Sequence, residues 1–247
     1  SLSMLGSGGS PAGRAGSVVG HWSAGRGPCA AALDFGQARR RDGGSAPDGG
    51  RDGLRFADGV GLGHELVVDV ADPPLAALHP AIPPEHALGG FVGVSAYARA
   101  PERSGRLLEE VLGAERRGAD VWDVRGPRRG GTIRLDRPPA ERAVRGAGTV
   151  HHIAWGTTVA EHPLWQRRLR DAGVRATDVI DRYYFRSVYF REPSGILYEI
   201  ADDAPGFTRD LPLEELGSRV ILPAWLEPRR EQIVAGLTPL PDPRATV

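Results

Sequence analysis

Apolar positions along the chain alternate between short strand-like runs and two helical faces. One helical face precedes Gly113, and the other, built on Leu164, Trp165 and Leu169, precedes Gly173. Because glycine commonly follows the last turn of a helix, both stretches are predicted to be helices. Each has one strand-like run before it and about three after it, which predicts a repeated unit of one strand, one helix and three strands.

This unit is expected three times, over residues 17–70, 89–138 and 148–203, and the first copy is the least complete. The clearest repetition lies between residues 56–66 and 190–200. In both, phenylalanine, an acidic residue, glycine, glutamate and an aliphatic residue recur at identical offsets. Both segments have the pattern of two strands joined by a tight turn. The sequence therefore predicts an α+β fold of tandem βαβββ modules.

Three further segments differ in composition from these units. Residues 1–16 are rich in glycine and serine and are expected to be disordered. Residues 71–88 contain five prolines and are expected to link the first two units. Residues 204–247 carry several large apolar side chains, so we expect this segment to wrap back onto the last unit.

Composition limits the partners and the compartment. The chain has 31 basic and 31 acidic residues, so its charge gives no reason to expect nucleic acid or an anionic membrane as partner. No apolar stretch approaches the roughly 20 residues that cross a bilayer, and residues 1–20 lack the apolar centre of a signal peptide. The single cysteine, Cys29, fits a reducing compartment. We therefore expect a cytoplasmic protein.

Candidate chemistry lies on two predicted strands of the third unit. The strand over residues 148–155 carries adjacent histidines, His151 and His152, and the strand that ends at Ile200 carries Glu199 in an apolar run. A carboxylate in a buried strand is costly unless it is compensated. A metal ion would compensate it, and imidazole with carboxylate is the ligand set of non-haem Fe(II) oxygenases.

Simpler explanations of the same residues stay open. His152 could be a core histidine satisfied by a hydrogen bond, and Glu199 could form an ion pair with Arg182 or Arg191. The repeat provides a control, because Glu65 occupies the same offset as Glu199. His162, which precedes a proline at a helix start, is expected at the surface.

The third unit also resembles a known family. The resemblance rests on Gly-Thr-Val-His-His-Ile-Ala-Trp at 148–155, on Asp-Arg-Tyr-Tyr-Phe-Arg-Ser-Val-Tyr-Phe-Arg-Glu-Pro at 181–193, and on Leu-Tyr-Glu-Ile at 197–200. These residues resemble the vicinal oxygen chelate superfamily of glyoxalases, bleomycin resistance proteins and extradiol dioxygenases. Within it, the chain looks closest to hydroquinone-type ring-cleaving dioxygenases. The resemblance implies βαβββ modules that form half-open barrels around the site.

The resemblance also implies a function and a set of site residues. The function would be that of an Fe(II)-dependent, extradiol-type ring-cleaving dioxygenase, with Mn(II) or another divalent metal as the alternative cofactor. Its substrates would be O2 and a small hydroquinone- or catechol-like aromatic. His152 and Glu199 would bind the metal. His151 and Tyr189 would manage protons, and Arg182 would stabilise negative charge.

The chain departs from the family pattern in one respect. The family takes its first histidine ligand from an opening module, and this chain starts at what resembles the second. Gly93 stands where related enzymes have an alternative ligand, and His21 is the other histidine on a convincing strand start. Three explanations stay open: a truncated enzyme, a decayed site, or a homo-oligomer in which a partner chain supplies the ligand. The alternative functions are a glyoxalase-like lyase or isomerase with another metal, and a non-catalytic binding module.

Overall fold

The computed structural model describes residues 19–24, 53–57, 62–68, 82–83, 86–126, 129–140 and 150–239. The segment at 1–16 and most of the expected linker at 71–88 lie outside these residues. The strands of the first two units are β1 (Val19–Ala24), β2 (Gly53–Ala57), β3 (Gly63–Val68), β4 (Leu88–Tyr97), β5 (Glu115–Arg116), β6 (Val121–Arg125) and β7 (Gly130–Asp136). Those of the third unit are β8 (Ile153–Gly156), β9 (Ile180–Asp181), β10 (Arg186–Arg191) and β11 (Leu197–Ala201).

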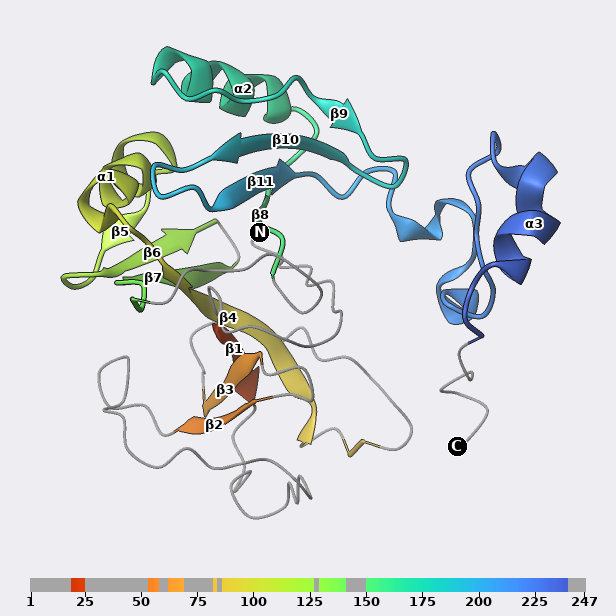
Figure 1. The fold of residues 1–247 in the computed structure, drawn as a ribbon, viewed down its shortest axis with the longest axis horizontal. Coiled ribbons are helices and arrows are strands. Elements are labelled where there is room, and N and C mark those ends of the chain that lie inside the picture. Colours follow the sequence, from red (N-terminus) through yellow and green to blue (C-terminus); the bar gives the residue numbers. More distant parts are fainter. Residues whose placement is uncertain are drawn as a thin grey trace.

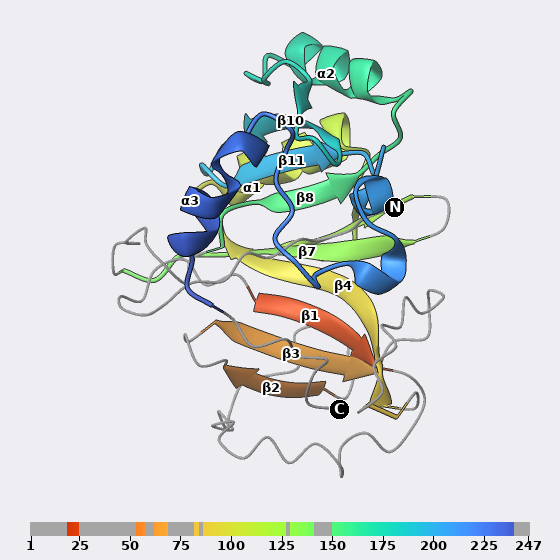
Figure 2. The ribbon, with the colours of Figure 1, turned by 90° about the vertical axis from the view of Figure 1, so that its right-hand side faces the viewer.

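The strands form two sheets (Figure 1). A seven-stranded sheet has the order β2-β3-β1-β4-β7-β6-β5, and a four-stranded sheet has the order β8-β11-β10-β9. Figure 2 shows β2, β3, β1, β4 and β7 stacked one after another across the molecule. Neither sheet closes into a barrel within the described residues. The predicted α+β class with open modules is therefore confirmed.

The helix of the second unit follows the predicted pattern. Helix α1 (Pro101–Arg106) continues as a π-helical turn over Leu107–Val111, and the predicted apolar face is buried. A Cβ atom added to Gly105 would lie 2.4 Å from the ring of Trp122. Glycine is therefore needed at this position for the close approach of the helix to β6.

The helix of the third unit matches its prediction only in part. Helix α2 (His162–Asp171) starts with a proline in its first turn, and Gly173 follows it with a φ of +73°. Leu169 is completely buried, whereas Leu164 is 57% exposed. The predicted apolar face was therefore wrong for Leu164. Positions five apart on a helix differ by about 140° in direction, so these two leucines point to different sides.

The hairpins of the internal repeat have the same register. Arg55 of β2 pairs with Glu65 of β3, just as Tyr189 of β10 pairs with Glu199 of β11. In each unit the first strand then adds in parallel, β1 to β3 and β8 to β11. The first two units are joined by an antiparallel pairing of their first strands, β1 and β4. The repeat seen in the sequence is thus a repeat of structure.

A single buried apolar cluster connects the second and third units. It contains Trp122 and Ile133 from one unit and Ile153, Tyr198 and Leu169 from the other. Helix α2 lies over β10 and β11 in Figure 1. The four-stranded sheet therefore has a core face, covered by α2, and an opposite, non-core face.

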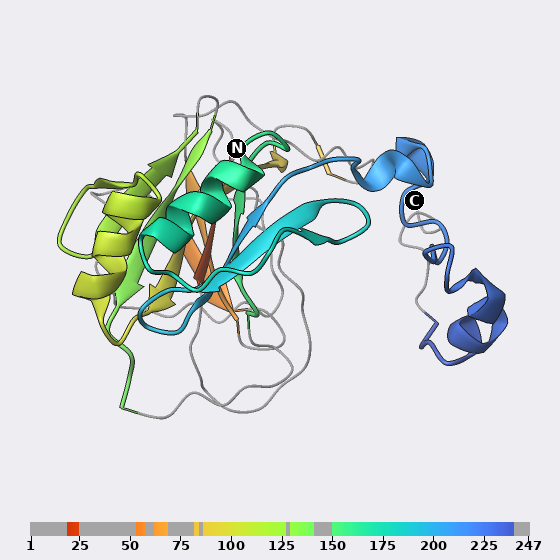
Figure 3. The ribbon, with the colours of Figure 1, turned by 90° about the horizontal axis from the view of Figure 1, so that it is seen from above.

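The first half of the C-terminal segment contacts the third unit. Its short helices lie at Phe207–Arg209, Leu213–Glu215, Glu227–Arg229 and, as α3, at Arg230–Ala235. Phe207 and Trp225 pack against Tyr184 and Tyr183, but α3 extends away from both sheets (Figure 3). The wrapping of the whole segment 204–247 stays a prediction, because residues 240–247 lie outside the described part of the chain. Trp225 stays 67% exposed.

The described residues include no helix that combines the length and the apolar character needed to cross a membrane.

The packing of α2 predicts a contrast between its two leucines. Leu169→Ala should lower the free energy of unfolding by about 2–5 kcal/mol, because it leaves a cavity in the core. Leu164→Ala, on the exposed side of the same helix, should change it by less than about 0.5 kcal/mol. Urea unfolding of both variants checks this, and equal losses would contradict the described orientation of α2.

Candidate metal centre

Glu199 is placed by the alternation of strand β11. Its neighbours Tyr198 and Ile200 point into the core, so Glu199 points to the opposite face of the sheet. On the adjacent strand β10, Ser187 and Tyr189 point to that same face. Glu199 is only 3% exposed. The sheet therefore holds a buried carboxylate on its non-core face, as the sequence pattern suggested.

The two oxygens of Glu199 have different partners. Oε1 accepts hydrogen bonds from Tyr189 Oη at 2.7 Å and from Ser187 Oγ. Oε2 lies 2.7 Å from Nε2 of His152, the residue that directly precedes β8. The structure thus brings together the predicted residues His152, Tyr189 and Glu199.

These contacts keep Glu199 ionised. Burial alone would raise its pKa, but hydrogen bonds from His152, Ser187 and Tyr189 outweigh burial and lower the pKa to about 2. Burial and the bond to Glu199 also raise the pKa of the Tyr189 hydroxyl. At neutral pH the centre therefore combines a carboxylate anion with a protonated phenol that donates to it.

His151 lies beside Nδ1 of His152, the ring nitrogen that does not face Glu199. The two Nδ1 atoms are 2.9 Å apart, and the rings are nearly perpendicular. His151 is exposed, whereas His152 is partly buried. A metal bound at Nε2 of His152 requires the proton on Nδ1, and Nδ1 of His151 could then accept that hydrogen bond.

Arg182 lies at the rim of the centre. Its side chain is exposed, and its guanidinium carbon is 5.9 Å from the centroid of the Tyr189 ring. Arg191 donates to the carbonyl of Gly195 at the far end of the hairpin. In the described part of the chain, neither arginine forms an ion pair with Glu199. The ion-pair explanation of Glu199 therefore receives no support.

The repeated glutamate, Glu65, is compensated differently. Its Oε1 lies 3.2 Å from Nε of Arg55, which occupies the register position of Tyr189. The position equivalent to Ser187 is Gly53. An arginine cation thus balances the charge of Glu65, whereas Glu199 has only neutral hydroxyl donors and a histidine.

A third metal ligand is not found among the described residues, where no group of three His, Cys, Asp or Glu side chains is placed to hold an ion. In the second unit, the position that corresponds to His152 by strand register is Gly93, in β4. His21 lies on β1 of the seven-stranded sheet, which is not a neighbour of β8 or β11. The described residues therefore bring together one imidazole and one carboxylate, which are two of the three groups in a facial triad.

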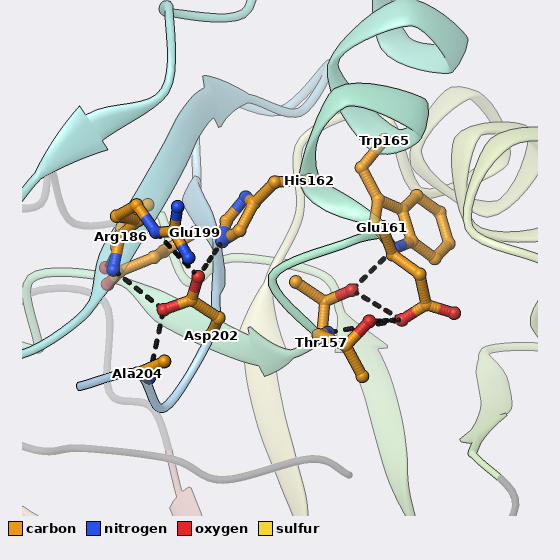
Figure 4. Close-up of polar contacts among 10 residues, drawn as sticks. Thr157, Glu161, His162, Trp165, Arg186, Glu199, Asp202 and Ala204 are labelled. Carbon is orange, nitrogen blue, oxygen red and sulfur yellow. Dashed lines mark hydrogen bonds and ion pairs between the residues drawn. The ribbon is translucent and has the colours of Figure 1, made fainter. Parts of the chain in front are cut away.

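A second polar cluster lies beside the centre and was missed from the sequence. Asp202 accepts hydrogen bonds from the backbone N–H and from Nε of Arg186, both at 3.0 Å, and from the N–H of Ala204 at 3.2 Å (Figure 4). Nε2 of His162 lies 3.5 Å from Oδ2 of the same carboxylate. This cluster fixes the start of β10 to the end of β11.

The expectation that His162 lies at the surface was wrong, because its side chain is 2% exposed. His162 precedes Leu169 by seven positions, which places both on the same side of α2. This seven-residue spacing was the feature of the sequence that could have predicted the burial of His162. The only sequence feature that pointed to Ser187 was its position two residues before Tyr189, on the same face of the strand. The identity of its partner could not be read from the sequence.

Comparisons with known proteins show a family and several similar chains. Residues 32–200 match the model of the Glyoxalase/Bleomycin resistance protein/Dioxygenase superfamily. MhqO of Bacillus subtilis (strain 168), named as a ring-cleaving dioxygenase, is 42% identical over 162 residues, or 64% of this chain and 52% of MhqO. MhqE of the same organism, with the same kind of name, is 36% identical over 187 residues, or 74% of this chain and 62% of MhqE.

Two more similarities extend the comparison. The chlorohydroquinone/hydroquinone 1,2-dioxygenase of Sphingobium indicum is 29% identical over 187 residues, which are 70% of this chain and 57% of that enzyme. A crystal structure of a Bacillus subtilis protein named as a dioxygenase superposes with a TM-score of 0.76 and 32% identity, over 96% of this chain and 76% of that one. The chain thus spans between half and two thirds of the length of MhqO, MhqE and the Sphingobium indicum enzyme.

The buried position of His162 predicts a pH dependence. Burial lowers its pKa below 6.5, although the nearby charge of Asp202 opposes this. Because the folded pKa is depressed, the stability contributed by neutral His162 is complete above pH 6.5 and is lost as the pH falls through the folded pKa. NMR titration of its ring protons should give a pKa below 6.5, and His162→Gln should flatten the loss of stability. A pKa at or above 6.5 would contradict the described burial.

Proposed function

The chain belongs to the Glyoxalase/Bleomycin resistance protein/Dioxygenase superfamily, and we propose that it carries the metal centre of an Fe(II)-dependent, extradiol-type ring-cleaving dioxygenase. The membership confirms the resemblance inferred from the sequence. The proposed substrate is a hydroquinone- or catechol-like aromatic, cleaved with O2. The observation that carries the proposal is the buried, ionised Glu199, whose Oε2 faces a histidine nitrogen and has no arginine partner among the described residues.

The residues present fit a divalent metal. Two ligand atoms bound to one ion at about 2.0–2.2 Å lie about 3 Å apart when their bonds are perpendicular. His152 Nε2 and Glu199 Oε2, at 2.7 Å, are near that separation. One imidazole and one carboxylate are two members of the facial triad typical of non-haem Fe(II) oxygenases. Mn(II) or another divalent metal is the alternative.

The free edge of β8 indicates where the third ligand would enter. The first strands of the first two units, β1 and β4, pair in an antiparallel manner. In the described residues β8, the first strand of the third unit, pairs only with β11. A strand added along the free edge of β8 would run past His152. We propose that the third ligand comes from such a strand, in a longer protein that includes this chain or in a second copy.

The side chains around the metal position have separate tasks in this proposal. When bound, Fe(II) would supply open positions for a dihydroxy-aromatic substrate and for oxygen. Tyr189 holds Oε1 of Glu199 through its hydroxyl. Arg182, above the Tyr189 ring, offers positive charge to an ionised substrate hydroxyl. His151 is exposed beside His152, and when its Nδ1 does not accept the N–H of His152, its imidazole can take the proton of that hydroxyl.

The metal ligands are tested by alanine variants with an internal control. His152→Ala and Glu199→Ala should each abolish stoichiometric retention of Fe(II) after anaerobic desalting, because each removes a ligand. Glu65→Ala removes the equivalent glutamate of the first unit and should leave metal retention unchanged. If Glu65→Ala and Glu199→Ala had equal effects, the assignment of Glu199 would be wrong.

Oxygen uptake distinguishes the proposed function from its two rivals. The iron-loaded protein should consume O2 with a hydroquinone or catechol but not with the corresponding dimethyl ether, which has no hydroxyl to ionise. Metal binding without oxygen uptake would favour a glyoxalase-like lyase or isomerase. A protein that neither retains metal nor consumes oxygen would be a non-catalytic binding module.

A further inference from the structure

Ser187 occupies a specific place beside the metal position. It lies on β10 two residues before Tyr189, so both side chains point to the same face of the sheet. Tyr189 is directly opposite Glu199, and Ser187 reaches Glu199 along the diagonal from its own partner, Ala201. The Ser187 side chain is completely buried, and its hydroxyl donates to Glu199 Oε1.

Both hydroxyl donors act on the same carboxylate oxygen. An ionised carboxylate has about four lone-pair directions, two on each oxygen. The hydroxyls of Ser187 and Tyr189 donate to the two lone pairs of Oε1, whereas Oε2 faces His152. Rotation of the carboxylate would break two bonds at once. We infer that Ser187 is a positioning residue, which holds Glu199 so that Oε2 alone is presented as a metal ligand.

The internal repeat supports this inference. In the first unit the positions of Ser187 and Tyr189 are taken by Gly53 and Arg55. There the glutamate, Glu65, points its Oε1 to the arginine and is engaged in an ion pair. The two hairpins therefore share a backbone register but differ in the glutamate. Glu65 forms an ion pair with Arg55, whereas the hydroxyls of Ser187 and Tyr189 hold one oxygen of Glu199 and leave the other facing His152.

The backbone that carries Ser187 is itself fixed. The preceding residue, Arg186, donates its N–H to Oδ1 of Asp202, and its carbonyl accepts the N–H of Asp202 at 3.1 Å (Figure 4). The Asp202 side chain has no exposed surface. Because these bonds hold the start of β10 against the end of β11, the Ser187 hydroxyl has a defined position relative to Glu199.

This inference rests on the proposed function, and its test compares three serine variants. Ser187→Ala removes the donor, and Ser187→Thr keeps a hydroxyl. Ser104→Ala is the matched control, because Ser104 is also completely buried and donates to a buried glutamate, Glu192, at the other end of the hairpin. Thermal unfolding establishes that each variant folds.

Anaerobic titration with Co(II) alone should show a clear order of affinity. Ser187→Ala should bind about 10–100-fold more weakly than the unmodified chain, as expected for the loss of a group that orients a ligand. Ser187→Thr should recover most of this affinity. Ser104→Ala should bind normally, even where its loss of stability equals that of Ser187→Ala. Normal binding by Ser187→Ala, together with lost binding by Glu199→Ala, would overturn the inference and leave the proposed function intact.

A second measurement does not depend on metal binding. In metal-free crystals of Ser187→Ala, the Glu199 carboxylate should adopt a different or a second orientation, with Oε2 no longer held at His152 Nε2. An unchanged single orientation would overturn the positioning role of Ser187. If the unmodified chain and Glu199→Ala bound Co(II) equally, the proposed function would fail, and the carboxylate orientation would still decide the role of Ser187.

Discussion

A carboxylate buried in a β-sheet has to be compensated, and the third unit of this protein is arranged around that requirement. Glu199 is ionised in a site where burial alone would favour its neutral form. Two hydroxyls of β10 and one imidazole before β8 provide the compensation. None of these groups carries the permanent positive charge of an arginine, so the centre keeps the negative charge that a divalent metal would neutralise.

The first unit shows the other solution to the same problem. Glu65 sits at the same register position, but an arginine on the adjacent strand balances it. The two hairpins share a backbone and differ in the partners of one glutamate. This comparison within one chain distinguishes a structural glutamate from a candidate ligand, and it does so through chemistry, because both residues are buried.

Much of this arrangement could be predicted from the sequence, because its signals are local. The repeat at 56–66 and 190–200 and the apolar face before Gly113 follow from short-range patterns. The pairing of His152 with Glu199 was implied by the family resemblance. Other features depend on which surfaces meet. Leu164 and Leu169 are both apolar, but their separation of five positions puts them on different sides of α2, and only Leu169 meets the core. The hydrogen bond from Ser187 to Glu199 depends on the register of β10 against β11, which the sequence does not specify. The direction of the C-terminal segment depends on tertiary contacts that apolar content alone does not specify.

Anomalous diffraction at the iron edge tests the central claim most directly. Crystals exposed to Fe(II) without oxygen should show one peak within bonding distance of both His152 Nε2 and Glu199 Oε2, while Oε1 keeps its bonds from Ser187 and Tyr189. The peak should be absent at Glu65, where Arg55 already balances the charge. An iron peak away from His152, or one bound through Oε1, would contradict the account of how this sheet prepares its carboxylate.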